Sequence, residues 1–178
     1  MHELTRTDPY VETIWRAFEL RPEPAPTLDP KGDYLQNAWA NSVYPLAARL
    51  GVTMKLPPVQ PRSRLAHEAA HWARSLGRFD DYHQAIFRAF FELGENIGEI
   101  SVLMSLASEA GLNQASLGEA LKAHEFTQSV LADEEDAHAL GITGVPAFIA
   151  DRKAARTGVQ SLESLRQLVE YARAGLIS

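Results

Sequence analysis

The 178-residue sequence contains no cysteine. Disulfide bonds, thiolate catalysis, cysteine-ligated zinc sites and thiol redox chemistry are therefore excluded for this chain as it stands. Positive charge is also in deficit: the sequence has 17 Lys and Arg residues against 23 Asp and Glu residues, and the net charge is −6. Nucleic-acid affinity comes mostly from Lys and Arg contacting phosphates, so we expect no nucleic-acid partner.

Long apolar runs are missing as well. No run approaches the ~20 residues that span a bilayer, and the first ten residues have no apolar signal-peptide core. We therefore expect a cytoplasmic protein without a membrane partner. Hydrophobic residues make up 46% and charged residues 22% of the chain, which is typical of one globular domain or of one domain with an insertion.

The first third of the chain reads as a strand, a loop and a helix. Six of the ten residues in Val11–Leu20 are apolar, which predicts a mostly buried strand. Four prolines between residues 22 and 30 indicate an extended loop. A helix is expected from Asp33 to about Leu50, disturbed near Pro45 and ended by Gly51.

The middle of the sequence predicts a block of helices. Glycines at the expected helix exits suit the left-handed conformation at which helices commonly end. Ser63, Asp80 and Ser116 are the expected caps of three of these helices. The expected helices run over residues 63–77, 80–94, about 98–110, a short stretch from 116, and about 127–140.

After Gly141 the pattern changes to that of a hairpin. The apolar run Ile142–Ala150 predicts one strand, the polar Asp151–Lys153 a turn, and residues 154–159 a returning antiparallel strand. Ser161 then caps a final amphipathic helix. The order strand, helical block, hairpin and helix indicates an α/β fold with a helical insertion.

The motif His67-Glu68-Ala69-Ala70-His71 matches the zinc-protease pattern H-E-x-x-H. Two histidines four residues apart share a helix face and can bind Zn²⁺, while the glutamate activates a water. However, no pattern singles out a third ligand. A helical wheel places both histidines on the polar face among arginines that would oppose a cation. We therefore expect a solvated or interface histidine pair with no metal and no cofactor, and keep a small zinc hydrolase as the less favoured alternative.

The run Ala139–Phe148, ALGITGVPAF, resembles the cis-proline loop of the DsbA family of thioredoxin-fold proteins. Three further segments resemble its cytosolic FrnE-like branch, which is related to 2-hydroxychromene-2-carboxylate isomerases: Trp15–Pro22, Ser63–His67, and Phe87–Phe91 with Gly94. The resemblance implies a thioredoxin-like core over residues 1–30 and 138–178, with an all-helical insertion over 31–137.

The resemblance also implies a site. Gly144, Val145 and Pro146 correspond to the family's substrate loop, with a cis Val145–Pro146 bond and a Val145 backbone that pairs with an extended peptide. The family begins with a strand and a helix that carry its Cys-x-x-Cys pair. We expect this N-terminal strand-helix unit to be missing here, so that no catalytic residue can be assigned.

The resemblance therefore implies a thiol–disulfide oxidoreductase lineage without a redox-active cysteine pair. Whether the chain is an enzyme stays open at this point. The alternative on the same fold is a non-catalytic protein that binds a peptide or protein partner, and a homodimer is also open.

Overall fold

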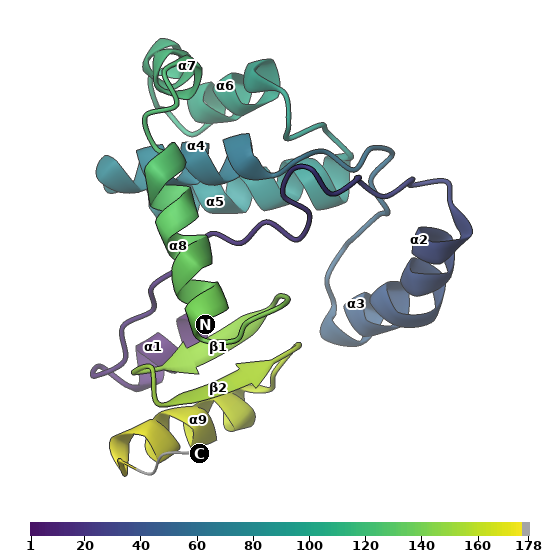
Figure 1. Ribbon diagram of the computed structural model, residues 1–178. Helices are drawn as coiled ribbons and strands as arrows, with labels where there is room; N and C mark the ends of the chain where they lie inside the picture. Colours follow the sequence, from purple (N-terminus) through teal and green to yellow (C-terminus); the bar gives the residue numbers. More distant parts are fainter. Residues whose placement is uncertain (176–178) are drawn as a thin grey trace. The chain divides into compact units, whose positions relative to one another are not determined.

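The computed structural model describes residues 1–175 and divides into two compact units (Figure 1). One unit combines residues 1–20 with the chain from Ala132 onward, and the other is Arg21–Leu131. The last three residues of the predicted core range, 176–178, lie outside the described residues.

The unit Arg21–Leu131 is helical. The helices α4 and α5 pack against each other and against α6 and α7 (Figure 1). Tyr82 lies in this core with no exposed surface, and its hydroxyl donates a 2.8 Å hydrogen bond to the Leu103 carbonyl. The elements are α2 (Asp33–Ala38), η1 (Trp39–Val43), α3 (Tyr44–Leu50), α4 (Arg64–Ser75), α5 (Phe79–Arg88), η2 (Ala89–Leu93), α6 (Ile100–Glu109), α7 (Gln114–Lys122) and the start of α8 (Thr127–Ala139).

The predicted disturbance near Pro45 is confirmed. Residues 39–43 form a π-helical turn between α2 and α3, and the helix ends at Gly51 with φ 67°. Proline has no N–H to donate to the carbonyl four residues earlier, so the regular α-helical bonding pattern cannot continue through it.

Two predicted helix caps are wrong. Helix α5 begins at Phe79, so Asp80 lies inside its first turn instead of capping it. Helix α7 is capped by Asn113, whose Oδ1 accepts hydrogen bonds from the backbone N–H groups of Ala115 and Ser116. A side-chain oxygen preceding the first turn can reach these N–H groups, whereas Ser116 already lies within the turn.

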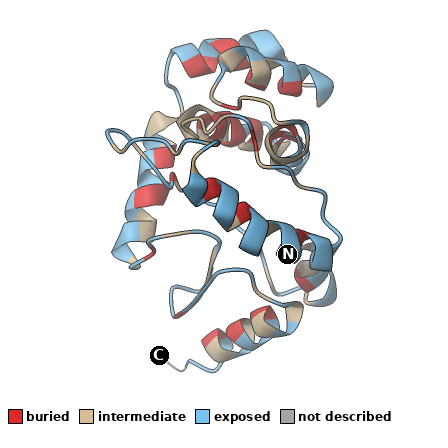
Figure 2. Cartoon of the chain, turned by 90° about the vertical axis from the view of Figure 1, so that its right-hand side faces the viewer, coloured by how far each residue is buried: buried red, intermediate tan, exposed pale blue. Residues whose placement is uncertain are grey.

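The other unit contains α1 (His2–Thr7), the later part of α8, the antiparallel strands β1 (Ala147–Ala150) and β2 (Ala154–Thr157), and α9 (Leu162–Arg173). The hairpin and the Ser161 cap of α9 are confirmed, since Ser161 Oγ accepts from Ser164 N–H. Helix α9 contacts α1 and both strands and carries its buried residues along one side (Figure 2).

The predicted strand over Val11–Leu20 is wrong. This segment has no regular secondary structure, and the described sheet contains only β1 and β2. It is also less buried than predicted, with Ile14 61% and Leu20 64% exposed. A strand forms only beside another strand that makes hydrogen bonds with the backbone of its alternate residues. In this segment two carboxylate side chains accept the backbone hydrogen bonds instead, as described below.

Candidate functional site

The predicted substrate loop starts from a fixed helix end. After α8, the Gly141 N–H donates to the His138 carbonyl and the Ile142 N–H to the Ala137 carbonyl, both at 2.9 Å. Gly141 has φ 72°, which suits glycine at the end of a helix. Ile142 is 5% exposed, so a buried side chain anchors the start of the loop.

Gly144, Val145 and Pro146 lie together at the entrance of β1. Val145 is 48% exposed, Pro146 is exposed and Gly144 is half-buried. The Val145–Pro146 peptide bond is cis, as predicted. The Pro146 carbonyl accepts a 2.8 Å hydrogen bond from the Gly158 N–H beside β2. The loop is thus held at both ends while its tip stays accessible.

Two neighbouring carboxylates of α8 bind the backbone that precedes Arg21. Asp133 Oδ2 accepts from the Ala17 N–H at 2.9 Å, and Glu134 Oε1 accepts from the Glu19 N–H at 3.0 Å. Asp133 Oδ1 also lies 2.7 Å from the guanidinium of Arg16. Both carboxylates are buried. They satisfy N–H groups that would otherwise be costly to bury, a role that the sequence analysis missed. The signal was the acidic run at residues 133–136 inside a helix.

The H-E-x-x-H motif has a packing role at its glutamate. Glu68 is 1% exposed, and its Oε1 accepts a 2.7 Å hydrogen bond from the hydroxyl of Thr127, the first residue of α8. His67 and His71 are half-buried. Within residues 1–175, no group of three or more His, Cys, Asp or Glu side chains is placed to hold a metal ion.

The isolated His83, to which the sequence analysis assigned nothing, lies in a row of rings on α5. Its imidazole stacks on Phe79 at 4.8 Å between ring centres and lies 4.7 Å from Phe87. Burial, with a smaller contribution from the nearby charge of His67, lowers the pKa of His83 to about 4. The side chain is therefore neutral near pH 7.

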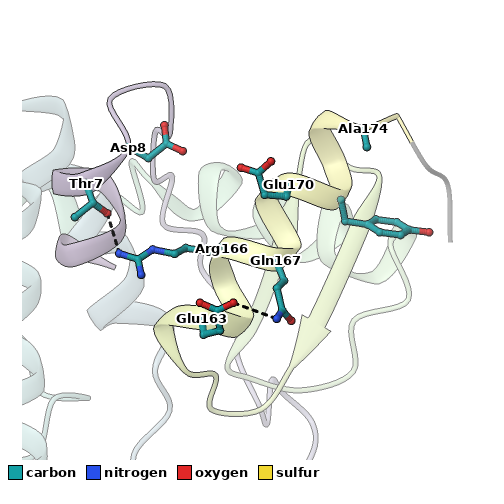
Figure 3. Close-up of a pocket in the computed structure, with 8 residues that line it drawn as sticks. Thr7, Asp8, Glu163, Arg166, Gln167, Glu170 and Ala174 are labelled. Atoms are coloured by element: carbon teal, nitrogen blue, oxygen red, sulfur yellow. Dashed lines mark hydrogen bonds between the residues drawn. The ribbon is translucent and has the colours of Figure 1, made fainter.

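A shallow groove lies between the end of α1 and α9 (Figure 3). Arg166 reaches the Thr7 hydroxyl at 3.4 Å, and Arg173 pairs with Asp8 at 2.8 Å. The guanidinium of Arg173 lowers the pKa of Asp8. The Arg173–Asp8 ion pair and the Arg166–Thr7 contact hold α9 against the end of α1, and the groove defines no ligand class.

The cis-proline loop, the hairpin that follows it and the C-terminal helix packed on that hairpin are those of a thioredoxin-like domain. The family model of the DSBA-like thioredoxin domain matches residues 1–170, and the chain belongs to this family. This confirms the predicted family and its mixed helix and strand fold.

Two relatives support the assignment. Protein YwbO of Bacillus subtilis (strain 168) is 40% identical over 146 residues, which cover 78% of this chain and 72% of YwbO. The crystal structure of the probable DsbA oxidoreductase SCO1869 from Streptomyces coelicolor matches with a TM-score of 0.82 and 25% identity, over 99% of this chain and 82% of that one.

A solved structure from Nitrosomonas europaea matches with a TM-score of 0.66 at 18% identity, over 80% of this chain and 76% of that one, and supports the fold alone. No helix within residues 1–175 is long and apolar enough to cross a membrane.

Proposed function

We propose that this protein binds extended peptide segments at Gly144, Val145 and Pro146, on a DsbA-like fold of thiol–disulfide oxidoreductase lineage, and supplies no thiol of its own. The observation that carries the proposal is the exposed tip of the loop, with Val145 48% exposed. The same proposal assigns the unit built around the hairpin as the thioredoxin-like core and the unit Arg21–Leu131 as the helical insertion. It also assigns the protein to the FrnE-like branch of the family and to the cytoplasm.

Rigid presentation of a backbone supports peptide binding. The buried Ile142 and the Pro146–Gly158 hydrogen bond fix the loop on both sides. A loop that is already ordered loses little conformational entropy when a ligand binds. An extended peptide can pair with such a backbone through main-chain hydrogen bonds. These bonds do not depend on the side chains of the peptide, so peptides of many sequences can make them.

The test is the binding of a fluorescein-labelled peptide in which three valines alternate with threonines between terminal lysines, measured by fluorescence anisotropy. Val145→Asp places a charge on the proposed contact surface, and we expect affinity to fall by roughly tenfold or more. The matched control is Val52→Asp, since Val52 is 51% exposed and lies in the unit Arg21–Leu131, outside the proposed binding loop.

Circular dichroism should show that both variants fold like the parent. Equal affinity of the two variants, or no saturable binding of the peptide by the parent protein, would refute the proposed function.

A further inference from the structure

The helix formed by α2, η1 and α3 is joined to the rest of its unit by few contacts. Among the described elements of the unit Arg21–Leu131, α4, α5, α6 and α7 pack against one another, and none of them brings its backbone against α2, η1 or α3 (Figure 1). The residues that this helix buries are Leu35, Trp39 and Ala47. Because local stability follows the number of buried apolar contacts, this helix should open more easily than the four helices of the core.

The chain on both sides of this helix is held firmly. On one side, the Arg62 guanidinium donates a 2.7 Å hydrogen bond to the Arg21 carbonyl. On the other side, the Lys55 N–H donates a 2.7 Å hydrogen bond to the Phe91 carbonyl, and Pro57 is fully buried. The helix is therefore the tip of an excursion whose two ends are fixed to the unit.

Hydrogen bonds also set the bounds of the piece between these fixed ends. The Gln36 side chain donates to the Pro30 carbonyl at 2.7 Å, and the Val52 N–H donates to a carbonyl of α3 at 2.9 Å. Residues 30–52 are thus tied together around the helix. Residues 27–29 and 53–54 connect this piece to the fixed ends.

Trp39 fastens the piece to the unit. Its indole is 8% exposed, and its ring centre lies 6.3 Å from that of Phe91, within the range of favourable aromatic pairs. The contact joins the two π-helical turns η1 and η2, and such turns are frequent at functional sites. A second contact is a 3.1 Å hydrogen bond that the Tyr44 hydroxyl accepts from the Leu56 N–H.

Phe91 also continues the row of rings on α5. Its ring centre lies 5.7 Å from that of Phe87, which is 50% exposed. Trp39 therefore covers one end of a row that is already open to solvent at its neighbouring ring. When Trp39 moves away, the Phe91 ring becomes accessible beside that of Phe87.

We propose that residues 30–52 form a flap that opens as one piece, with Trp39 as its latch, and that the place it leaves on Phe91 binds an uncharged planar ring of a small molecule. Residues 27–29 and 53–54 are the hinges. The chemistry of the occupant follows from Trp39 itself, because an indole fills this place in the closed form. The inference goes beyond the proposed function and uses none of its residues.

Hydrogen–deuterium exchange followed by mass spectrometry tests the flap. After correction for intrinsic rates, we expect the amides of residues 33–50 to exchange roughly tenfold or more faster than those of α4 and α5. Trp39→Ala should accelerate exchange in residues 33–50 by roughly a further tenfold and leave α4 within about threefold of the parent. Tyr34→Ala is the matched control, because Tyr34 lies on α2 and is 69% exposed, and it should change neither region.

Three results would overturn the flap. They are equal protection of residues 33–50 and α4 in the parent protein, no acceleration by Trp39→Ala, and equal acceleration of both regions by Trp39→Ala. If Trp39→Ala unfolds the whole unit, Trp39 belongs to the core and the flap is likewise overturned.

Fluorescence titration with N-phenyl-1-naphthylamine, an uncharged planar probe, tests the ring site. A ligand of the open form has an apparent affinity lowered by the fraction of molecules that are open, so removing the latch should tighten binding in Trp39→Ala by roughly tenfold or more relative to the parent and to Tyr34→Ala. Adding Phe91→Leu, which keeps an apolar side chain but removes the ring, should weaken that binding by roughly fivefold or more. Equal affinity in Trp39→Ala and Tyr34→Ala, or no effect of Phe91→Leu, would overturn the ring site.

Discussion

The most direct test of the architecture around the hairpin is Asp133→Ala. This substitution removes the acceptor of the Ala17 N–H and the ionic partner of Arg16 in one step. The Asp133 side chain is 2% exposed, and Ala17 is 5% exposed. Water therefore cannot easily replace the lost acceptor, and the Ala17 N–H becomes a buried donor without a partner.

The magnitude follows from these two contacts. A buried hydrogen bond to a charged acceptor contributes about 1.5–3 kcal/mol to stability. Arg16 is 57% exposed, so its ion pair adds at most about 1 kcal/mol. We expect the free energy of unfolding to fall by about 2–4 kcal/mol, which lowers the midpoint of thermal unfolding by roughly 4–16 °C in a chain of this size.

Asp133→Asn separates the two contributions. Asparagine keeps an oxygen that can accept from the Ala17 N–H but loses the charge, so about half of the destabilisation should remain. The control is Glu135→Ala on the exposed side of the same helix, with an expected change within ~0.5 kcal/mol. Thermal unfolding followed by circular dichroism measures all three. One kcal/mol corresponds to roughly 2–4 °C in the midpoint of thermal unfolding. If the midpoint of Asp133→Ala lies within about 1–2 °C of that of Glu135→Ala, the carboxylate does not hold this segment.

Three further predictions concern pH, packing and activity. In the unfolded chain the pKa of His83 is near 6.5, whereas in the folded protein it is about 4. Between these pH values the unfolded state therefore binds more protons than the folded state. The stability of the fold should fall as the pH drops from about 6.5 to 4. His83→Phe should flatten this part of the urea-midpoint profile, and an unchanged profile would contradict the assignment. Thr127→Val removes the hydrogen bond to the buried Glu68 and should lower the free energy of unfolding, measured in urea, by about 1–3 kcal/mol. The control Thr53→Val, at an exposed position, should lower it far less. Similar losses of stability in the two variants would count against the Thr127–Glu68 contact. Finally, pure protein of this sequence should not reduce insulin above the uncatalysed rate, because reduction requires an attacking thiolate and the chain has no cysteine; measurable turnover would contradict that reasoning.

Local signals in the sequence were sufficient for most of the helices and for the hairpin. Gly51, Gly94 and Gly141 end helices with positive φ at the expected positions, because the left-handed conformation is a property of the local backbone. The hairpin and its turn were also predictable from an apolar run, a polar turn and a returning run, although the strands Ala147–Ala150 and Ala154–Thr157 are shorter than the predicted 142–150 and 154–159. The cap of α7 was wrong by three residues, because asparagine and serine compete equally well for such a position.

The strand predicted for Val11–Leu20 shows what local pattern cannot decide. Its composition favours extended backbone, but a strand exists only where another strand supplies its hydrogen bonds. In the structure the Ala17 and Glu19 N–H groups bond to side chains that are more than 110 residues away in the sequence. No periodicity in either segment indicates that pairing.

The sequence by itself determined the absence of thiol chemistry, the positions of most helices and the residues of the cis-proline loop, because each depends on residue type or on near neighbours. Tertiary structure alone decided that Glu68 is buried against Thr127 and that Asp133 and Glu134 bind backbone. These features depend on which distant groups meet, and burial makes each unmet hydrogen bond costly enough to matter.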